Sequence, residues 1–256
     1  MRIVIKVGTS TLTHPTGWQN IRMVERLCRV ISDLKNAGHE IIMVSSGAIG
    51  MGVGKLSLSE RPKDIPTKQA AAAVGQCELM YTYDKLFSEY HHTVAQILLT
   101  ASDIDCENRR KNFHNTLSRL LELGAIPVIN ENDTVATDEI VIGDNDTLAA
   151  MTAVSISADL LVLLSDIDGL YTANPRTDEN AKLISYVKEI TPEILALAEG
   201  KGSELSTGGM ATKLRAASTC MANGVDMIIA NGGNPELLYD IADGKPIGTR
   251  FSAKEA

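Results

Sequence analysis

Two lysines lie where the sequence predicts an anion-binding site. Lys6 interrupts the apolar run of a short predicted strand, residues 2–8, and a buried ammonium is costly unless an anion meets it. Lys213 lies in the first turns of a predicted helix that follows the glycine-rich start of segment 207–224. Backbone N–H groups and the helix dipole favour an anion at such a start. Each lysine alone also fits a solvated position, Lys6 on an edge strand and Lys213 in a flexible loop, but together they predict phosphate binding.

Two acidic, amide-rich segments provide a second kind of chemistry. Residues 130–133 read Asn-Glu-Asn-Asp, and residues 143–146 read Gly-Asp-Asn-Asp. A turn followed by a helix cap explains one of the three polar residues Asp144, Asn145 and Asp146. The remaining groups suit an ammonium ion, a Mg²⁺-phosphate complex, or lysines that need a counter-charge.

These residues lie at the ends of predicted strands. Short apolar runs predict strands at 2–8, 40–47, 93–100, 125–133, 159–171 and 225–233. Helical periodicity predicts helices at 20–37, 67–90, 109–123, 146–158, 191–199 and 207–224, and Gly47 predicts a turn at the end of the second strand. Strict alternation of the two indicates an α/β fold with a largely parallel, helix-covered sheet. Ligands bind beyond the carboxyl ends of such strands, so the lysines and the acidic segments should meet there.

Composition and motifs exclude several other classes of protein. The 256 residues are 44% hydrophobic and carry a net charge of −8, which weighs against a nucleic-acid or anionic-membrane partner. No signal peptide or membrane-length apolar run is present, and the four scattered cysteines (Cys28, Cys77, Cys106 and Cys220) fit free thiols in a reducing cytosol. A Walker-type phosphate loop is missing, and the glycines of 47–54 do not follow the dinucleotide-binding spacing.

The histidines indicate what kind of nucleophile the site could use. None of the five follows a predicted strand or pairs with an acid at metal spacing. No histidine base is therefore available, and a substrate carboxylate, which is already ionised at pH 7, would not need one.

Seven segments together resemble the amino acid kinase family. They are KVGTS (6–10), VSSGAIGMG (44–52), AAAVGQ (71–76), VINENDTVAT (128–137), IGDNDTLAA (142–150), LLSDIDGLYTANPR (163–176) and STGGMATKLRAA (206–217). The resemblance runs from residue 2 to about residue 250. It implies a three-layer αβα sandwich with an eight-stranded, mainly parallel central sheet. It also implies a single kinase domain over 1–256, with glutamate bound by about 1–158 and ATP by 159–256, and without the C-terminal PUA domain of many relatives.

The pairing of INEND with GDND implies a member that acts on L-glutamate. ATP with Mg²⁺ would phosphorylate the γ-carboxylate, giving L-glutamyl 5-phosphate, the first step of proline biosynthesis. A sibling kinase for aspartate or an N-acylated glutamate, and a non-catalytic amino-acid sensor, are the alternatives.

The resemblance also implies residue roles. Lys6 and Lys213 would neutralise charge on the transferred phosphoryl group, and Asp146 would hold both lysines. Four residues would bind the substrate: Ser46, Gly47, Asp133 and Asn145. The nucleotide would meet Lys6, Ser165, Asp166, Thr207, Gly208, Gly209, Met210, Ala211, Thr212 and Lys213. No metal ligand is assigned, and Asp144 remains open between substrate ammonium and turn formation.

Partners follow from the same resemblance. Proline would inhibit by feedback, with the loop around 134–142 as the place to look for its site. A homo-oligomer in the cytoplasm is expected, as is handover of the labile product to glutamyl phosphate reductase. Neither nucleic acid nor a membrane is expected as a partner.

Overall fold

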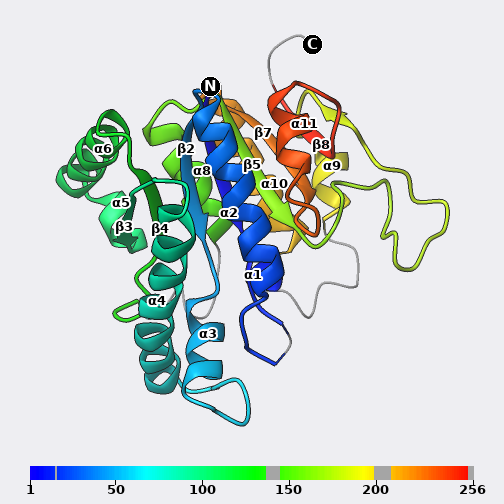
Figure 1. The fold of residues 1–256 in the computed structure, drawn as a ribbon. Coiled ribbons are helices and arrows are strands. Elements are labelled where there is room, and N and C mark those ends of the chain that lie inside the picture. Colours follow the sequence, from blue (N-terminus) through cyan, green and yellow to red (C-terminus); the bar gives the residue numbers. More distant parts are fainter. Residues whose placement is uncertain (15, 137–144, 199–208, 253–256) are drawn as a thin grey trace.

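A mainly parallel sheet of eight strands forms the centre of the molecule (Figure 1). The computed structural model describes residues 1–14, 16–136, 145–198 and 209–252. The strand order is β3-β4-β2-β1-β5-β7-β8-β6, and within the described residues β7 and β8 form the single antiparallel pair. The strands are β1 (Arg2–Val7), β2 (Glu40–Ser45), β3 (Val94–Leu99), β4 (Ile126–Glu131), β5 (Leu160–Ser165), β6 (Tyr186–Val187), β7 (Asp226–Asn231) and β8 (Thr249–Phe251).

Helices cover both faces of the sheet, which confirms the αβα architecture. They are α1 (Thr9–Leu12), α2 (Ile21–Asn36), α3 (Ala48–Lys55), α4 (Ile65–Ser88), α5 (Ala101–Asp105), α6 (Glu107–Glu122), α8 (Asn145–Ser155), α9 (Pro192–Ala196), α10 (Met210–Ala222) and α11 (Leu237–Ala242). In Figure 1, α2 runs in front of the sheet, whereas α8 and α10 lie behind it. Each face has its own hydrophobic core, one including Leu27 and Phe87 and the other Leu117 and Leu214.

The alternation of side chains along β1 decides the direction of Lys6. Ile3, Ile5 and Val7 belong to the core under α2 and α4, whereas Val4 belongs to the core under α8. Side chains two apart in a strand share a face, so Lys6 points to the α8 side. The alternation along β1 thus directs the Lys6 side chain towards the start of α8.

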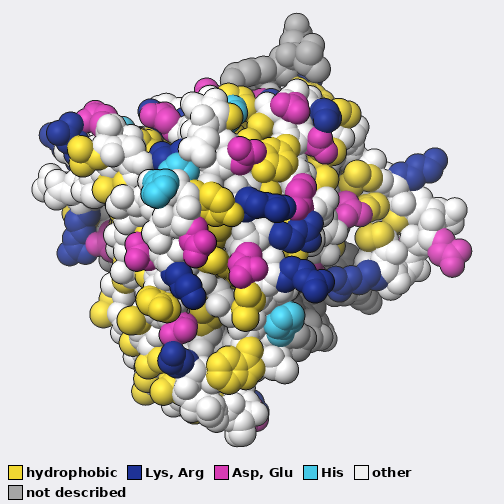
Figure 2. Space-filling model, viewed as in Figure 1, with side chains coloured by type: hydrophobic (Ala, Val, Ile, Leu, Met, Phe, Trp, Pro, Cys, Tyr) yellow, Lys and Arg dark blue, Asp and Glu magenta, His cyan; other side chains and the backbone are white. Residues whose placement is uncertain are grey.

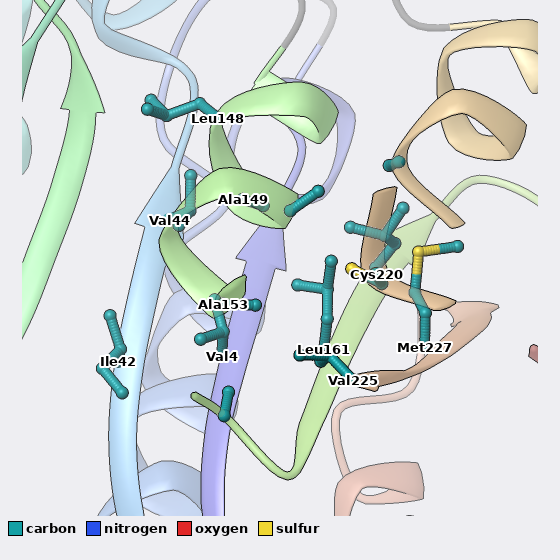
Figure 3. Close-up of a cluster of buried hydrophobic side chains, with 14 of the residues drawn as sticks. Val4, Ile42, Val44, Leu148, Ala149, Ala153, Leu161, Cys220, Val225 and Met227 are labelled. Carbon is teal, nitrogen blue, oxygen red and sulfur yellow. The ribbon is translucent and has the colours of Figure 1, made fainter. Parts of the chain in front are cut away.

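Small residues let α8 approach the strands closely. Ala149 and Ala153 are fully buried, and Figure 3 shows them beside Val4 and Val44 of the neighbouring strands β1 and β2. An alanine holds the helix at a shorter distance from the sheet than a leucine would. The first turn of α8 therefore lies next to the carboxyl ends of β1 and β2.

Two features of local structure differ from what the sequence suggested. The edge-strand alternative for Lys6 fails, because β1 pairs with β2 on one side and with β5 on the other. The turn expected at Gly47 is present, but the residues that follow it form the helix α3, which was not predicted. Gly52 of this helix allows close contact with α4, since a Cβ on Gly52 would lie 1.8 Å from the carbonyl oxygen of Ala71. Gly75 of α4 has the same relation to the carbonyl oxygen of Ala48, so close packing of α3 on α4 accounts for Gly52 and Gly75.

The described surface has a mixed charge. On the face drawn in Figure 2, acidic and basic side chains are intermingled. Arg26 of α2, for example, pairs with Glu236. No helix within the described ranges has the length and apolar character needed to cross a membrane. All four cysteines are free, with Cys28 and Cys220 buried and Cys77 and Cys106 exposed.

Candidate active site

A buried carboxylate between two ammonium groups forms the centre of the site. Lys6 Nζ lies 2.7 Å from Asp146 Oδ1, and Lys213 Nζ lies 3.0 Å from Asp146 Oδ2. The Asp146 side chain is 1% exposed, that of Lys213 8% and that of Lys6 12%. Two positive charges thus share one negative charge, which leaves a net positive centre suited to an incoming anion.

Three different elements deliver these groups to the carboxyl edge of the sheet. Lys6 is the second-last residue of the central strand β1, Asp146 is in the first turn of α8, and Lys213 is in the first turn of α10. The Thr212 hydroxyl lies 3.0 Å from Asp146 Oδ2 and 2.8 Å from the carbonyl oxygen of Gly209. The hydroxyl hydrogen can be donated to one of these two acceptors at a time. When it is donated to Asp146 Oδ2, it helps to orient the carboxylate.

The protonation of Asp146 reflects two opposing influences. Burial raises the pKa of its carboxyl group, but the charges and hydrogen bonds of Lys6 and Lys213 more than offset this, so the pKa lies below its usual value. The group is therefore ionised at neutral pH and keeps both lysines in place.

A row of buried amides begins beside this centre. Asn145 Nδ2 lies 2.8 Å from Ser46 Oγ, 3.0 Å from Asn130 Oδ1 and 3.2 Å from the carbonyl oxygen of Ser45. Asn130 Nδ2 in turn donates to Gln76 Oε1 of α4 over 2.8 Å. Asn145 thus ties the end of β2 to the end of β4, next to Asp146.

Sequence reasoning gave no role to several members of this row. Asn130 and Gln76 are buried and contact each other, and the Tyr83 hydroxyl lies 2.9 Å from Ser45 Oγ. Burial raises the pKa of Tyr83, so its hydroxyl stays protonated. The available signal was an asparagine within the apolar strand VIN and a glutamine after the small-residue run of α4.

The remaining expected substrate residues lie at the same edge. Ser46 and Gly47 follow β2, and Gly47 has a φ of 103° at the start of α3, a conformation that favours glycine. Asp133 is half-buried in the turn after β4. Asp144 lies outside the described residues.

The expected nucleotide residues divide between two strand ends and a helix start. Ser165 ends β5, and its hydroxyl donates to Asp166 Oδ1 over 3.3 Å. Asp166 also accepts from the exposed Arg176 over 3.1 Å. Gly209 caps α10, whose first turn holds Met210, Ala211, Thr212 and Lys213. Thr207 and Gly208 lie outside the described residues.

This fold and this site define a class of protein. The amino acid kinase family matches residues 1–231, and the chain therefore belongs to that family. Two solved structures share the fold: UMP kinase from Bacillus anthracis (TM-score 0.65, 14% identity, 99% of this chain and 96% of that chain) and an isopentenyl phosphate kinase (TM-score 0.65, 16% identity, 98% and 99%).

Among curated proteins, the chain is similar to glutamate 5-kinases along almost its full length. It is 54% identical to that of Clostridium perfringens, covering 99% of this chain and 96% of the relative. It is 55% identical to that of Clostridium acetobutylicum (99% and 95%) and 54% identical to that of Listeria monocytogenes (99% and 94%).

Proposed function

We propose that this chain transfers the γ-phosphoryl group of ATP to the γ-carboxylate of L-glutamate, giving ADP and L-glutamyl 5-phosphate, the first step of proline biosynthesis. The observation that carries the proposal is the buried Lys6–Asp146–Lys213 centre beside an amide row. It occurs in a chain that shares more than half of its residues with glutamate 5-kinases of nearly equal length.

The chemistry of these groups suits phosphoryl transfer. The reaction needs positioning and charge stabilisation rather than a covalent intermediate with the protein. The γ-carboxylate oxygen attacks the γ-phosphorus in line, the bond from phosphorus to the bridging oxygen breaks, and ADP leaves. Lys6 and Lys213 would stabilise negative charge on the phosphoryl and bridging oxygens. Asp146, which contacts both ammonium groups, would fix their positions without reacting.

Magnesium would reach this site together with the nucleotide. Where the chain is described, no group of three or more His, Cys, Asp or Glu residues could hold a metal ion, and both oxygens of Asp146 face lysines. Mg²⁺ commonly takes most of its ligands from phosphate and water, so this arrangement fits an ion carried by ATP. Bound there, it would supply charge neutralisation on the phosphates.

The two substrates would meet at Asp146 from opposite sides. The N-terminus of α10, which follows the cap residue Gly209, would present backbone N–H groups and the positive end of the helix dipole to the ATP phosphates. Ser165 and Asp166 complete the expected nucleotide set. On the other side, the proposed glutamate set consists of Ser46, Gly47, Asp133 and Asn145. Asn145 is adjacent in sequence to Asp146, which supports a γ-carboxylate bound next to the lysines.

Product trapping tests the proposed reaction directly. Hydroxylamine converts an acyl phosphate into a hydroxamate, so wild-type protein with ATP, Mg²⁺ and L-glutamate should yield hydroxamate in step with ADP. The same assay with aspartate and N-acetylglutamate separates sibling kinases. ADP release without hydroxamate from any of these acceptors would refute the reaction, and inertness of glutamate alone would refute the substrate.

The proposal also covers the regulation, the oligomeric state and the cellular location of the protein. Feedback inhibition by proline, a homo-oligomer, a cytoplasmic location and handover to glutamyl phosphate reductase are all proposed. The handover is supported by the lability of an acyl phosphate in water. Most of the loop expected to affect proline binding, residues 137–142, lies outside the described residues.

A further inference from the structure

Gln76, the last member of the amide row, has a side-chain N–H group with no partner among the described residues. Gln76 of α4 is 6% exposed, and its Oε1 accepts from Asn130 Nδ2 over 2.8 Å. Within the described part of the chain, Gln76 Nε2 has no hydrogen-bond partner. A buried donor that is left unpaired is destabilising, so such a group in a native structure calls for an explanation, and contact with a ligand is one.

Backbone groups fix which end of the Gln76 amide is the donor. The backbone N–H of Glu131 donates to Asn130 Oδ1 over 2.9 Å, so that atom is the oxygen. Asn130 Nδ2 must then face Gln76, and the atom that it meets must be the glutamine oxygen. If oxygen and nitrogen were exchanged in both side chains, the Asn130 NH2 group would face the backbone N–H of Glu131, and two donors would then meet. The unpaired atom of Gln76 is therefore an N–H donor that needs an acceptor.

The neighbours of Gln76 place this donor at the proposed glutamate site. The amide row runs from Asn145, next to Asp146, through Asn130 to Gln76. Seven residues earlier on α4, Gln69 Nε2 lies 3.3 Å from the carbonyl oxygen of Ala136. Residues seven apart share a helix face, so this face of α4 contacts both the end of β4 and the segment just after Asp133.

We propose that Gln76 binds the α-carboxylate of the amino-acid substrate, an inference that rests on the proposed function. The γ-carboxylate has to lie at Lys6 and Lys213 in order to react. The α-ammonium can only donate, so it suits the carboxylate of Asp133 and not an amide N–H. The α-carboxylate is the remaining acceptor, and a charged acceptor forms the stronger hydrogen bond. Gln76 would thereby select substrates with a second carboxylate beyond the reacting one.

Gln76→Glu tests this role with little change in shape. The new carboxylate still accepts from Asn130, but it places an oxygen where the donor was and repels the α-carboxylate. The paired acceptor is 4-aminobutanoate, which keeps the amine and the reacting carboxylate of glutamate but lacks the α-carboxylate. Hydroxamate formation gives kcat/KM for both, and the inhibition constant of 4-aminobutanoate against glutamate gives its binding without turnover. Gln76→Met, which lacks the donor and adds no charge, is measured in parallel.

Selective damage to glutamate is the expected result. Both variants should lower kcat/KM for glutamate roughly tenfold to a hundredfold, the range for one hydrogen bond to a charged group. The inhibition constant of 4-aminobutanoate and the KM for ATP should change less than threefold. The control Gln96→Glu, at an exposed position of β3, should alter neither.

The possible failures are distinguishable. Equal losses for both compounds would show that Gln76 has a structural role only, and unchanged kinetics with glutamate would show that it does not contact substrate. Either result overturns this inference while wild-type hydroxamate formation leaves the proposed function intact. No hydroxamate from wild-type protein and glutamate would overturn the proposed function and this inference together.

Discussion

Replacing Asp146 by asparagine should damage both the stability and the catalysis of this protein. The substitution keeps the shape of the side chain and removes one charge from the centre of three. With the N···O distances of 2.7 and 3.0 Å, Coulomb's law at an effective dielectric constant of about 20 gives roughly 6 kcal/mol for each attraction. These gross energies are largely offset by the desolvation of three buried ions.

The net loss on substitution is smaller than the gross attraction but still large. Removing one partner of a buried ion pair costs about 3–5 kcal/mol because the other charge remains uncompensated. In Asp146→Asn two ammonium groups remain, and they repel each other. We therefore expect the free energy of unfolding to fall by about 3–5 kcal/mol and kcat to fall by about 10²–10³-fold, as for loss of a preorganised electrostatic group.

Urea unfolding and the hydroxamate assay measure these two effects. The control is Glu78→Gln, because Glu78 forms an exposed pair with Lys55 over 2.9 Å. Exposed pairs contribute about 0–1 kcal/mol, so this variant should resemble wild type in both assays. An Asp146→Asn protein within 1 kcal/mol of wild-type stability (about fivefold in the unfolding equilibrium) and with a wild-type kcat would refute the reasoning.

Three further predictions concern protonation, packing and substrate binding. The pKa of Asp146 is lower in the folded protein than in the unfolded chain. The ionised carboxylate therefore stabilises the fold fully above about pH 4, and this stabilisation is lost as the pH falls through the folded pKa. The difference in unfolding free energy between wild type and Asp146→Asn should accordingly shrink in acid. Gly52→Ala should cost at least about 2 kcal/mol in urea unfolding through overpacking, because its Cβ would lie 1.8 Å from Ala71 O, whereas Gly50→Ala in the same helix, whose nearest contact is 3.5 Å, should be neutral or stabilising. Asn145→Ala should raise the KM for glutamate at least threefold more than the KM for ATP, and equal effects on both would contradict its placement in the glutamate site.

The location of the longer strands was the part of the fold that sequence could predict well, although the strand predicted at 159–171 ends at Ser165. Apolar runs located six of the strands, because a buried parallel sheet needs continuous apolar segments, and helical periodicity located the longer helices between them. The short strands β6 and β8 escaped, since strands of two and three residues carry no periodicity. Helix α3 escaped as well, because its glycines are poor helix formers in isolation, and the close contact of Gly52 with α4 is a tertiary feature.

The chemistry of the site was visible in sequence only where a residue was out of place. Lys6 within an apolar strand and the surplus of polar groups around Asp146 were both anomalies, and the structure brings these two residues into contact. Gln76 gave a weaker signal, a glutamine directly after a run of small residues, because a glutamine in a helix of mixed polarity is ordinary. Its burial and its contact with Asn130 depend on how α4 packs over β4, and this packing is a tertiary property.

Close packing and charge placement depend on each other in this molecule. Asp146 can reach Lys6 only because α8 lies close to β1, and that approach depends on Ala149 and Ala153. A larger residue at either position would push the start of α8 away from the strand end, lengthening a contact of 2.7 Å whose energy depends on distance. The two alanines, which look like ordinary core residues, are therefore needed for the contact between Asp146 and Lys6. For the same reason, a damaging substitution can lie a full helical turn away from any charged group.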